Sequence, residues 1–193
     1  MSKKKKGLAC RMGLPVLMLA LAAPVSQAAA APRNDEVVQI EVYMSRDGFH
    51  AGEAVVFALV AEIAAGWHIH DPEPADMFLI PTEIQLDESE NFNLKTIHYP
   101  ETVNEKYEYS DSELAVYLGK VAFGLMLEMK PGLAEGEHTL TGAFKFQACD
   151  HSSCLPPKSI PYTVTIHLVP DSQETRTLHP EIFEKIRFED ERK

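Results

Sequence analysis

Two cysteines that lie close together in the sequence have the clearest capacity for chemistry. Cys149 and Cys154 belong to the segment FKFQACDHSSCLPP, with four residues between them. Such a pair can form a structural disulfide, hold a metal ion, or open and close a disulfide in exchange with other thiols. The spacing is not the C-x-x-C of thioredoxins, and no helix follows, because Pro156 and Pro157 come next. Activation of a thiol must therefore come from nearby side chains or from a partner.

The strand that leads into the cysteines predicts how the first of them is placed. Phe144, Phe146 and Ala148 alternate with Gln147 and Cys149, so a regular strand turns Cys149 away from the main core. A second alternating segment begins at residue 162 and predicts another strand. Its side chains Tyr162, Val164 and Ile166 are expected to face the core. The sequence DHSS is then a loop with the cysteines at its mouth, near the surface and within disulfide distance.

The small size of the loop favours exchange chemistry over a structural role. A disulfide that closes so short a loop adds only about 2 kcal/mol to stability by the chain-entropy relation. The chain is also long enough to form a core without it. A redox disulfide is therefore favoured, while a structural bond and a metal site stay open.

The elements around the cysteines are predicted to be β-strands. Period-two apolar patterns, separated by turn residues, recur over residues 37–169 and indicate about seven to nine short strands in an antiparallel sandwich. Ala54–Ala64 is more continuously apolar than the other segments, which is typical of a strand buried on both faces. In the tail, residues 170–193, Pro180 is expected to begin a short helix whose Ile182, Phe183 and Ile186 share one side.

The N-terminus predicts export. Lys3–Lys6, an apolar run from Leu14 to Ala23 and small residues up to Ala30 have the order of a secretory signal peptide, residues 1–28 with cleavage at 28–31, followed by a linker to residue 36. A single membrane anchor is the alternative. Removal of the signal leaves 13 basic and 29 acidic residues, a net charge of −16. The mature chain is then expected not to span a membrane, not to bind nucleic acid, and to be in an oxidising compartment, the periplasm.

The cysteine segment FQACDHSSCLPP resembles the N-terminal periplasmic domain of the thiol:disulfide interchange protein DsbD. The stretches GWHIHDPEPADMFLIPTEIQL and YPETVNEKYEYSDSELAVYLGKV are similar to other parts of that family. The likeness covers roughly residues 37–169. It departs from the best-studied members in having four residues between the cysteines instead of five, and in a cap segment without glycine.

The resemblance implies an all-β, immunoglobulin-like sandwich that carries reducing equivalents by dithiol–disulfide exchange. It implies that Cys154 forms mixed disulfides with partners and that Cys149 is its intramolecular partner. Tyr107, Glu108 and Tyr109 match the cap loop that shields the disulfide. The implied partners are a membrane-embedded thiol electron donor of the DsbD or CcdA type, or a thioredoxin-like domain, and periplasmic oxidoreductase clients. Because the sequence ends at Lys193, the donor is expected to be a separate protein.

Four further residues are expected to tune the site. His68 and His70 stand where the family commonly has aromatic residues, Asp150 is expected to raise the thiol pKa, and His151 lies between the cysteines. The protein is interpreted as a component of a protein-disulfide reductase system, not a stand-alone catalyst, with no cofactor and no assigned metal ligand.

Two other functions remain open. One is a periplasmic copper- or zinc-binding sandwich that uses cysteine, the histidines above and Met77 as ligands. The simpler interpretation of His68 and His70 is a pair of half-exposed strand histidines that bind no metal. The other is a structural sandwich whose disulfide is inert.

Overall fold

The structure is a computed structural model that describes residues 33–188. The predicted signal peptide, residues 1–28, lies outside these residues. Among the helices that the structure describes, none is long and apolar enough to cross a membrane.

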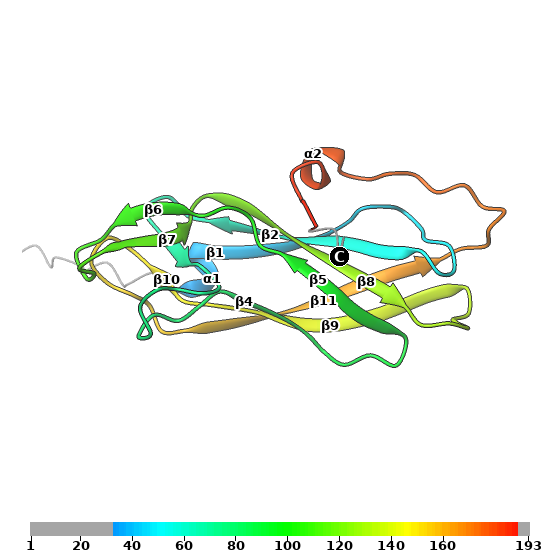
Figure 1. Cartoon of the computed structure of the whole chain (residues 1–193), viewed down its shortest axis with the longest axis horizontal. Coiled ribbons are helices and arrows are strands. Elements are labelled where there is room, and N and C mark those ends of the chain that lie inside the picture. The colour runs from blue at the N-terminus through cyan, green and yellow to red at the C-terminus, as the bar shows by residue number, and fades with distance from the viewer. Residues whose placement is uncertain (1–32, 189–193) are drawn as a thin grey trace, which may run out of the picture. The chain divides into compact units, whose positions relative to one another are not determined.

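Antiparallel strands in three sheets make up the domain (Figure 1). The first sheet has the order β1-β2-β8-β5, the second β10-β3-β7-β6, and the third β11-β9-β4. The elements are α1 (Asn34–Val37), β1 (Val38–Met44), β2 (Ala54–Ile63), β3 (His68–His70), β4 (Glu83–Leu86), β5 (Phe92–His98), β6 (Val103–Lys106), β7 (Glu113–Tyr117), β8 (Lys120–Met129), β9 (Gly136–Phe146), β10 (Ala148–Cys149), β11 (Lys158–Leu168) and α2 (Pro180–Phe183).

The main core lies between the sheet of β2 and β8 and the sheet of β9 and β11. Alternate residues of each strand point inward, as period two requires. Phe57 and Phe123 come from one sheet, and Phe144 and Ile166 from the other, and all four are fully buried in one apolar cluster. The predicted all-β, immunoglobulin-like antiparallel sandwich is confirmed. The structure divides the described chain into eleven strands where the sequence predicted seven to nine.

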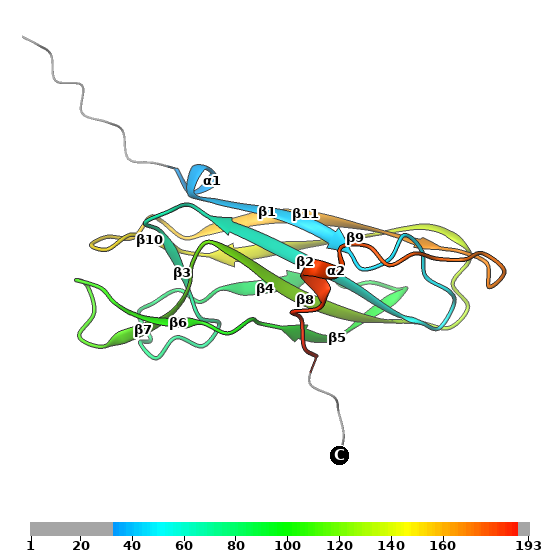
Figure 2. The same ribbon diagram turned by 90° about the horizontal axis from the view of Figure 1, so that it is seen from above.

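The outer face of the first sheet is covered by the C-terminal segment, and Figure 2 shows α2 lying over β2 and β8. Ala58 and Val60 of β2 pack with Ile186, which is 6% exposed, and with Ile182 and Phe183 of the tail. This explains why β2 is apolar on both faces. Gly124 of β8 permits the close approach, since a Cβ there would lie 2.4 Å from Ile186.

The second sheet lies at one end of the domain, where both views place β10, β3, β7 and β6 together (Figures 1 and 2). Its strands are short. The edge strand β10 follows β9 in the chain after a single residue, Gln147. The chain leaves the β9–β11 pairing at Phe146, and Ala148 then pairs with Ile69 of β3. This change of sheet brings the first cysteine next to the strand that carries His68 and His70.

Candidate redox-active disulfide site

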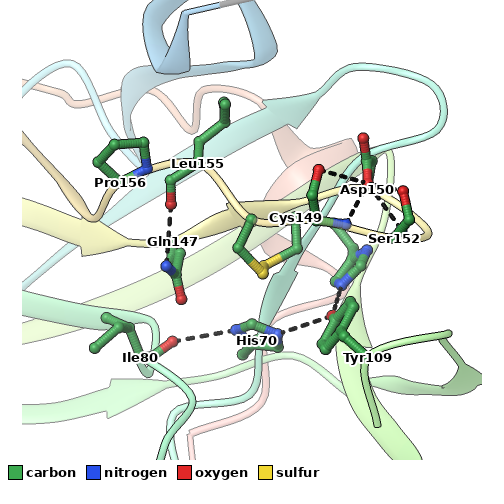
Figure 3. Close-up of a disulfide and its surroundings, with 12 residues drawn as sticks. His70, Ile80, Tyr109, Gln147, Cys149, Asp150, Ser152, Leu155 and Pro156 are labelled. Atoms are coloured by element: carbon green, nitrogen blue, oxygen red, sulfur yellow. Dashed lines mark hydrogen bonds between the residues drawn. A yellow bond between two sulfur atoms is a disulfide. The ribbon is translucent and has the colours of Figure 1, made fainter. Parts of the chain in front are cut away.

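The two cysteines form a disulfide at the mouth of a short loop. Cys149 and Cys154 are bonded through their sulfurs, with their Cα atoms 4.0 Å apart. The loop between them is closed by backbone hydrogen bonds from Asp150 N to Ser153 O (2.8 Å) and from Leu155 N to Ala148 O (2.8 Å). Gln147 adds a side-chain bond from its Nε2 to Leu155 O at 3.0 Å, which Figure 3 shows beside the disulfide.

The cysteines differ sharply in exposure. Cys154 is exposed, whereas Cys149 is fully buried. Ala148 packs into the main core, and Cys149 instead faces His68 across the β10–β3 pair, with its sulfur near both histidines. The predicted direction of Cys149, away from the main core, therefore agrees with the structure. Its predicted position near the surface is wrong, because a second layer of residues covers it.

The covering layer is the loop that joins β6 and β7, and we call its residues Tyr107, Glu108 and Tyr109 the cap. The ring of Tyr107 stacks on that of His68, with centroids 3.9 Å apart and planes 20° apart. Tyr107 is only 8% exposed, and burial raises the pKa of its hydroxyl to about 12. Glu108 N donates to His151 O at 3.1 Å, so the cap is also tied to the cysteine loop.

Tyr109 links the cap to both histidines through its hydroxyl (Figure 3). The oxygen lies 2.6 Å from Nε2 of His68 and 3.3 Å from Nε2 of His70. A hydroxyl can donate one hydrogen bond and accept another, so it can satisfy both rings at once. Burial raises the pKa of Tyr109, which keeps this hydroxyl protonated.

The two histidines are buried, contrary to the expectation that they are half-exposed. They are 1% and 0% exposed, because β3 lies between β10 and β7 with the cap over its outer face. Burial, and then the neighbouring His70, lower the pKa of His68 to about 4. Burial also lowers the pKa of His70, against the opposing effect of its bond to Ile80 O. Both rings are therefore neutral at pH 7.

The charged residues of the loop lie at the rim of the site. Asp150 Oδ1 accepts backbone hydrogen bonds from Ser152 and Ser153, at 2.8 and 2.7 Å, and these bonds lower the pKa of its carboxyl. His151 is 68% exposed and lies 3.8 Å from Glu108, a distance for an ion pair when the imidazole is protonated. Met77 is 86% exposed, unlike the buried histidines.

Sequence reasoning missed one member of the site, the backbone carbonyl of Ile80. It lies 3.3 Å from Nδ1 of His70 and orients that ring. Ile80 belongs to the irregular segment between β3 and β4, and any residue type supplies a carbonyl. No residue pattern could therefore have indicated its role.

The fold and site together define a class of protein. A β-sandwich with a capped disulfide between one exposed and one buried cysteine has the properties of a thiol–disulfide exchange module. Residues 32–165 match the family described as the thiol:disulfide interchange protein DsbD, N-terminal, and the chain belongs to that family.

The chain is also similar to two solved structures, and the first of them shows the same fold. The N-terminal periplasmic domain of ScsB from Proteus mirabilis aligns with a TM-score of 0.50 and 17% identity, over 72% of this chain and 49% of that chain. The chain thus spans about half the length of the ScsB structure. The N-terminal domain of Neisseria meningitidis DsbD in its reduced form aligns with a TM-score of 0.45 and 12% identity, over 76% of this chain and 94% of that one. No curated protein sequence matches the chain.

Proposed function

We propose that this protein is a periplasmic module that relays reducing equivalents through the Cys149–Cys154 pair. The donor would be a membrane-embedded thiol protein or a thioredoxin-like domain, and the acceptors would be client oxidoreductases. The unequal exposure of the two cysteines carries the proposal, because exchange requires one cysteine that a partner can reach and one whose sulfur can leave. Membership of the DsbD N-terminal family supports it.

Reduction of the module takes two exchange steps. A donor thiolate attacks the sulfur of the exposed Cys154, the Cys149–Cys154 bond breaks, and the sulfur of Cys149 leaves and takes up a proton. The second thiolate of the donor then attacks the donor sulfur of this mixed disulfide and releases Cys154. The donor dithiol ends as a disulfide, and the module gains two electrons and two protons.

Delivery to a client reverses these roles. The Cys154 thiolate attacks the client disulfide and forms a mixed disulfide, while one client sulfur leaves as a thiol. Cys149 then attacks Cys154, which expels the second client sulfur and restores the disulfide of the module. Cys149 reaches only Cys154 in this scheme, so its burial limits side reactions with other thiols.

The cap and the rim residues fit this cycle. The rings of Tyr107 and Tyr109 cover the side of the site where Cys149 lies, so we assign the cap a shielding role that ends when a partner docks. The apolar side chains of Met77 and Phe78 are 86% and 85% exposed, and their neighbour Leu79 packs with the cap cluster. A partner that covers them could displace the cap. Asp150, held ionised, would disfavour a thiolate beside it and slow premature reaction.

The reduction potential of the purified protein tests the proposal. The protein is equilibrated in glutathione buffers, its free thiols are trapped by alkylation, and the mass is read. A relay predicts a potential between those of thioredoxin and the strong periplasmic oxidants, about −270 to −120 mV. A potential below about −300 mV would mean a structural bond and would overturn the relay.

A matched pair of variants tests the roles of the two sulfurs. Cys149→Ser leaves the exposed thiol and should accumulate a stable mixed disulfide with glutathione disulfide. Cys154→Ser leaves the buried thiol and should react at least about tenfold more slowly, as its lower access requires. Equal rates in the two variants would contradict the assignment.

A further inference from the structure

Three metal-binding side chains converge beneath the cap: His68, His70 and Cys149. Each offers one ligand atom, and these three atoms lie within 4.8 Å of one another. All three residues are buried, at 1%, 0% and 0% exposure. A thiolate and two imidazoles in such proximity are a donor set for a soft metal ion.

Two adjacent strands and a backbone carbonyl hold the ligands in place. Cys149 of β10 pairs directly with His68 of β3, and His70 follows two residues along the same strand, on the same face. The carbonyl of Ile80 can only accept a hydrogen bond, so its contact at 3.3 Å places a proton on Nδ1 of His70. The lone pair of this neutral ring is then on Nε2, the arrangement found in metal-bound histidines.

Two contacts occupy the ligands in the oxidised, capped form. The Tyr109 hydroxyl lies 2.6 and 3.3 Å from the Nε2 atoms of His68 and His70 (Figure 3). The sulfur of Cys149 is bonded to that of Cys154. A metal ion can therefore enter only after the disulfide is reduced and the Tyr109 hydroxyl moves aside.

We propose that reduction of the disulfide creates a Cu⁺ site formed by His68, His70 and Cys149. An external dithiol supplies two electrons and two protons, becomes a disulfide, and leaves Cys149 and Cys154 as thiols. Cu⁺ then binds Cys149 as a thiolate, and the displaced proton passes to solvent. Bound metal and intramolecular disulfide exclude each other, because both need the sulfur of Cys149. The copper site requires that the disulfide can be reduced. It does not require that the protein relays electrons between partners.

The donor set favours Cu⁺ over other ions. Zn²⁺ prefers four ligands in a tetrahedron, while Mg²⁺ and Ca²⁺ prefer oxygen. The nearby carboxylate of Asp150 is engaged by the backbone N–H groups of Ser152 and Ser153. Three soft or intermediate ligands without a carboxylate suit monovalent copper.

The test uses cysteine variants that fix the state of the sulfur. Cys154→Ser keeps Cys149 as a free thiol, whereas Cys149→Ser removes the ligand. Each is titrated anaerobically with Cu⁺ in competition with a chromogenic Cu⁺ chelator. Wild type reduced with a phosphine and desalted, and Cys154→Ser, should each bind one Cu⁺. Oxidised wild type and Cys149→Ser should bind at least tenfold more weakly. Equal affinity of the two variants, or binding of Zn²⁺ but not Cu⁺ by Cys154→Ser, would overturn the proposal.

Histidine variants in the Cys154→Ser background separate the three-ligand site from a lone thiolate. Loss of an outer-shell partner commonly costs roughly 10–100-fold in metal affinity, so His70→Ala should cost at least that. His167→Ala is the control, since this histidine lies on β11 in another sheet, half exposed beside Glu137, and its loss should leave the affinity unchanged. Unchanged affinity in His70→Ala would overturn the site.

A gain of affinity provides a readout that misfolding cannot imitate. Tyr109→Phe keeps the ring but removes the hydroxyl that occupies both imidazoles, so it should tighten Cu⁺ binding several-fold. Weaker binding would contradict the proposed competition. The potential of the Cys149–Cys154 pair is measured separately on metal-free wild type. Failure of copper binding therefore leaves the relay standing, and failure of the relay leaves the metal site open to its own test.

Discussion

At the scale of single residues, the two cysteines have different surroundings although they are bonded to each other. Strand alternation predicted that Cys149 turns away from the main core, since parity depends only on local backbone geometry. Its complete burial could not be predicted in this way. Tyr107 and Tyr109, whose rings lie against or bond to the neighbouring His68, come from about 40 residues earlier in the chain, and their position depends on how the second sheet assembles.

Burial of His68 makes stability depend on pH. Its pKa is about 4 in the folded protein, below the roughly 6.5 expected for an unfolded chain. As the pH falls from 7 to 5, the unfolded chain binds a proton that the folded protein does not. The free energy of unfolding should therefore be lower at pH 5 than at pH 7, and this residue alone should account for about 2 kcal/mol of the decrease. Urea unfolding of the oxidised protein at the two pH values, with a metal chelator present, measures the loss.

His68→Phe tests the origin of this pH dependence. The phenyl ring preserves the stacking with Tyr107 but cannot bind a proton, so most of the decline between pH 7 and pH 5 should disappear. A decline of the same size in His68→Phe would show that other groups cause it.

At the scale of elements, the site depends on a change of sheet that no residue marks. The sequence predicts one strand through HTLTGAFKFQAC, and the alternation does continue to the cysteine. In the structure, the pairing with β11 ends before Gln147, and Ala148 and Cys149 pair with β3 instead. Periodicity identifies which residues face inward, but it carries no information about which strand lies alongside. The contact between Cys149 and His68 was therefore beyond sequence reasoning.

The cap should control the rate at which the disulfide is reduced, because the sulfur of Cys149, which must leave when Cys154 is attacked, lies on the side of the site that the cap covers. Tyr107→Ala removes the ring that stacks on His68 at 3.9 Å. An aromatic pair contributes roughly 0.5–1.5 kcal/mol beyond its buried area, so the open form should become about three- to tenfold more populated. Reduction by dithiothreitol, followed by quenching and alkylation, should accelerate by that factor.

Tyr43→Ala is the matched control for the cap. Tyr43 also contacts a histidine ring, that of His179, with centroids 4.8 Å apart, but it lies beside the C-terminal helix α2. Its removal should leave the reduction rate unchanged. Equal rates in wild type and Tyr107→Ala would mean that the cap does not limit access to the disulfide.

At the scale of the whole molecule, alternating patterns were sufficient to predict the sandwich. They follow from burial on one face of a strand, and they are clearest in the long strands β9 and β11. The apolar run of β2 also predicted burial on both faces. The tail pattern of Ile182, Phe183 and Ile186 predicted one apolar side of a helix, but its partner, the outer face of β2, is set by tertiary packing.

The main core should keep the protein folded when the disulfide is reduced. Cys149 and Cys154 are five positions apart, and a loop of this size adds only about 2 kcal/mol by the chain-entropy relation. For a domain of this length, such a loss lowers Tm by about 4–8 °C. Circular dichroism during heating, with and without a phosphine reductant, measures the shift. The double variant Cys149→Ser/Cys154→Ser should melt at the temperature of the reduced protein. Unfolding on reduction would mean that the bond holds the fold together, and the folded dithiol form that both the relay and the copper site require would not exist.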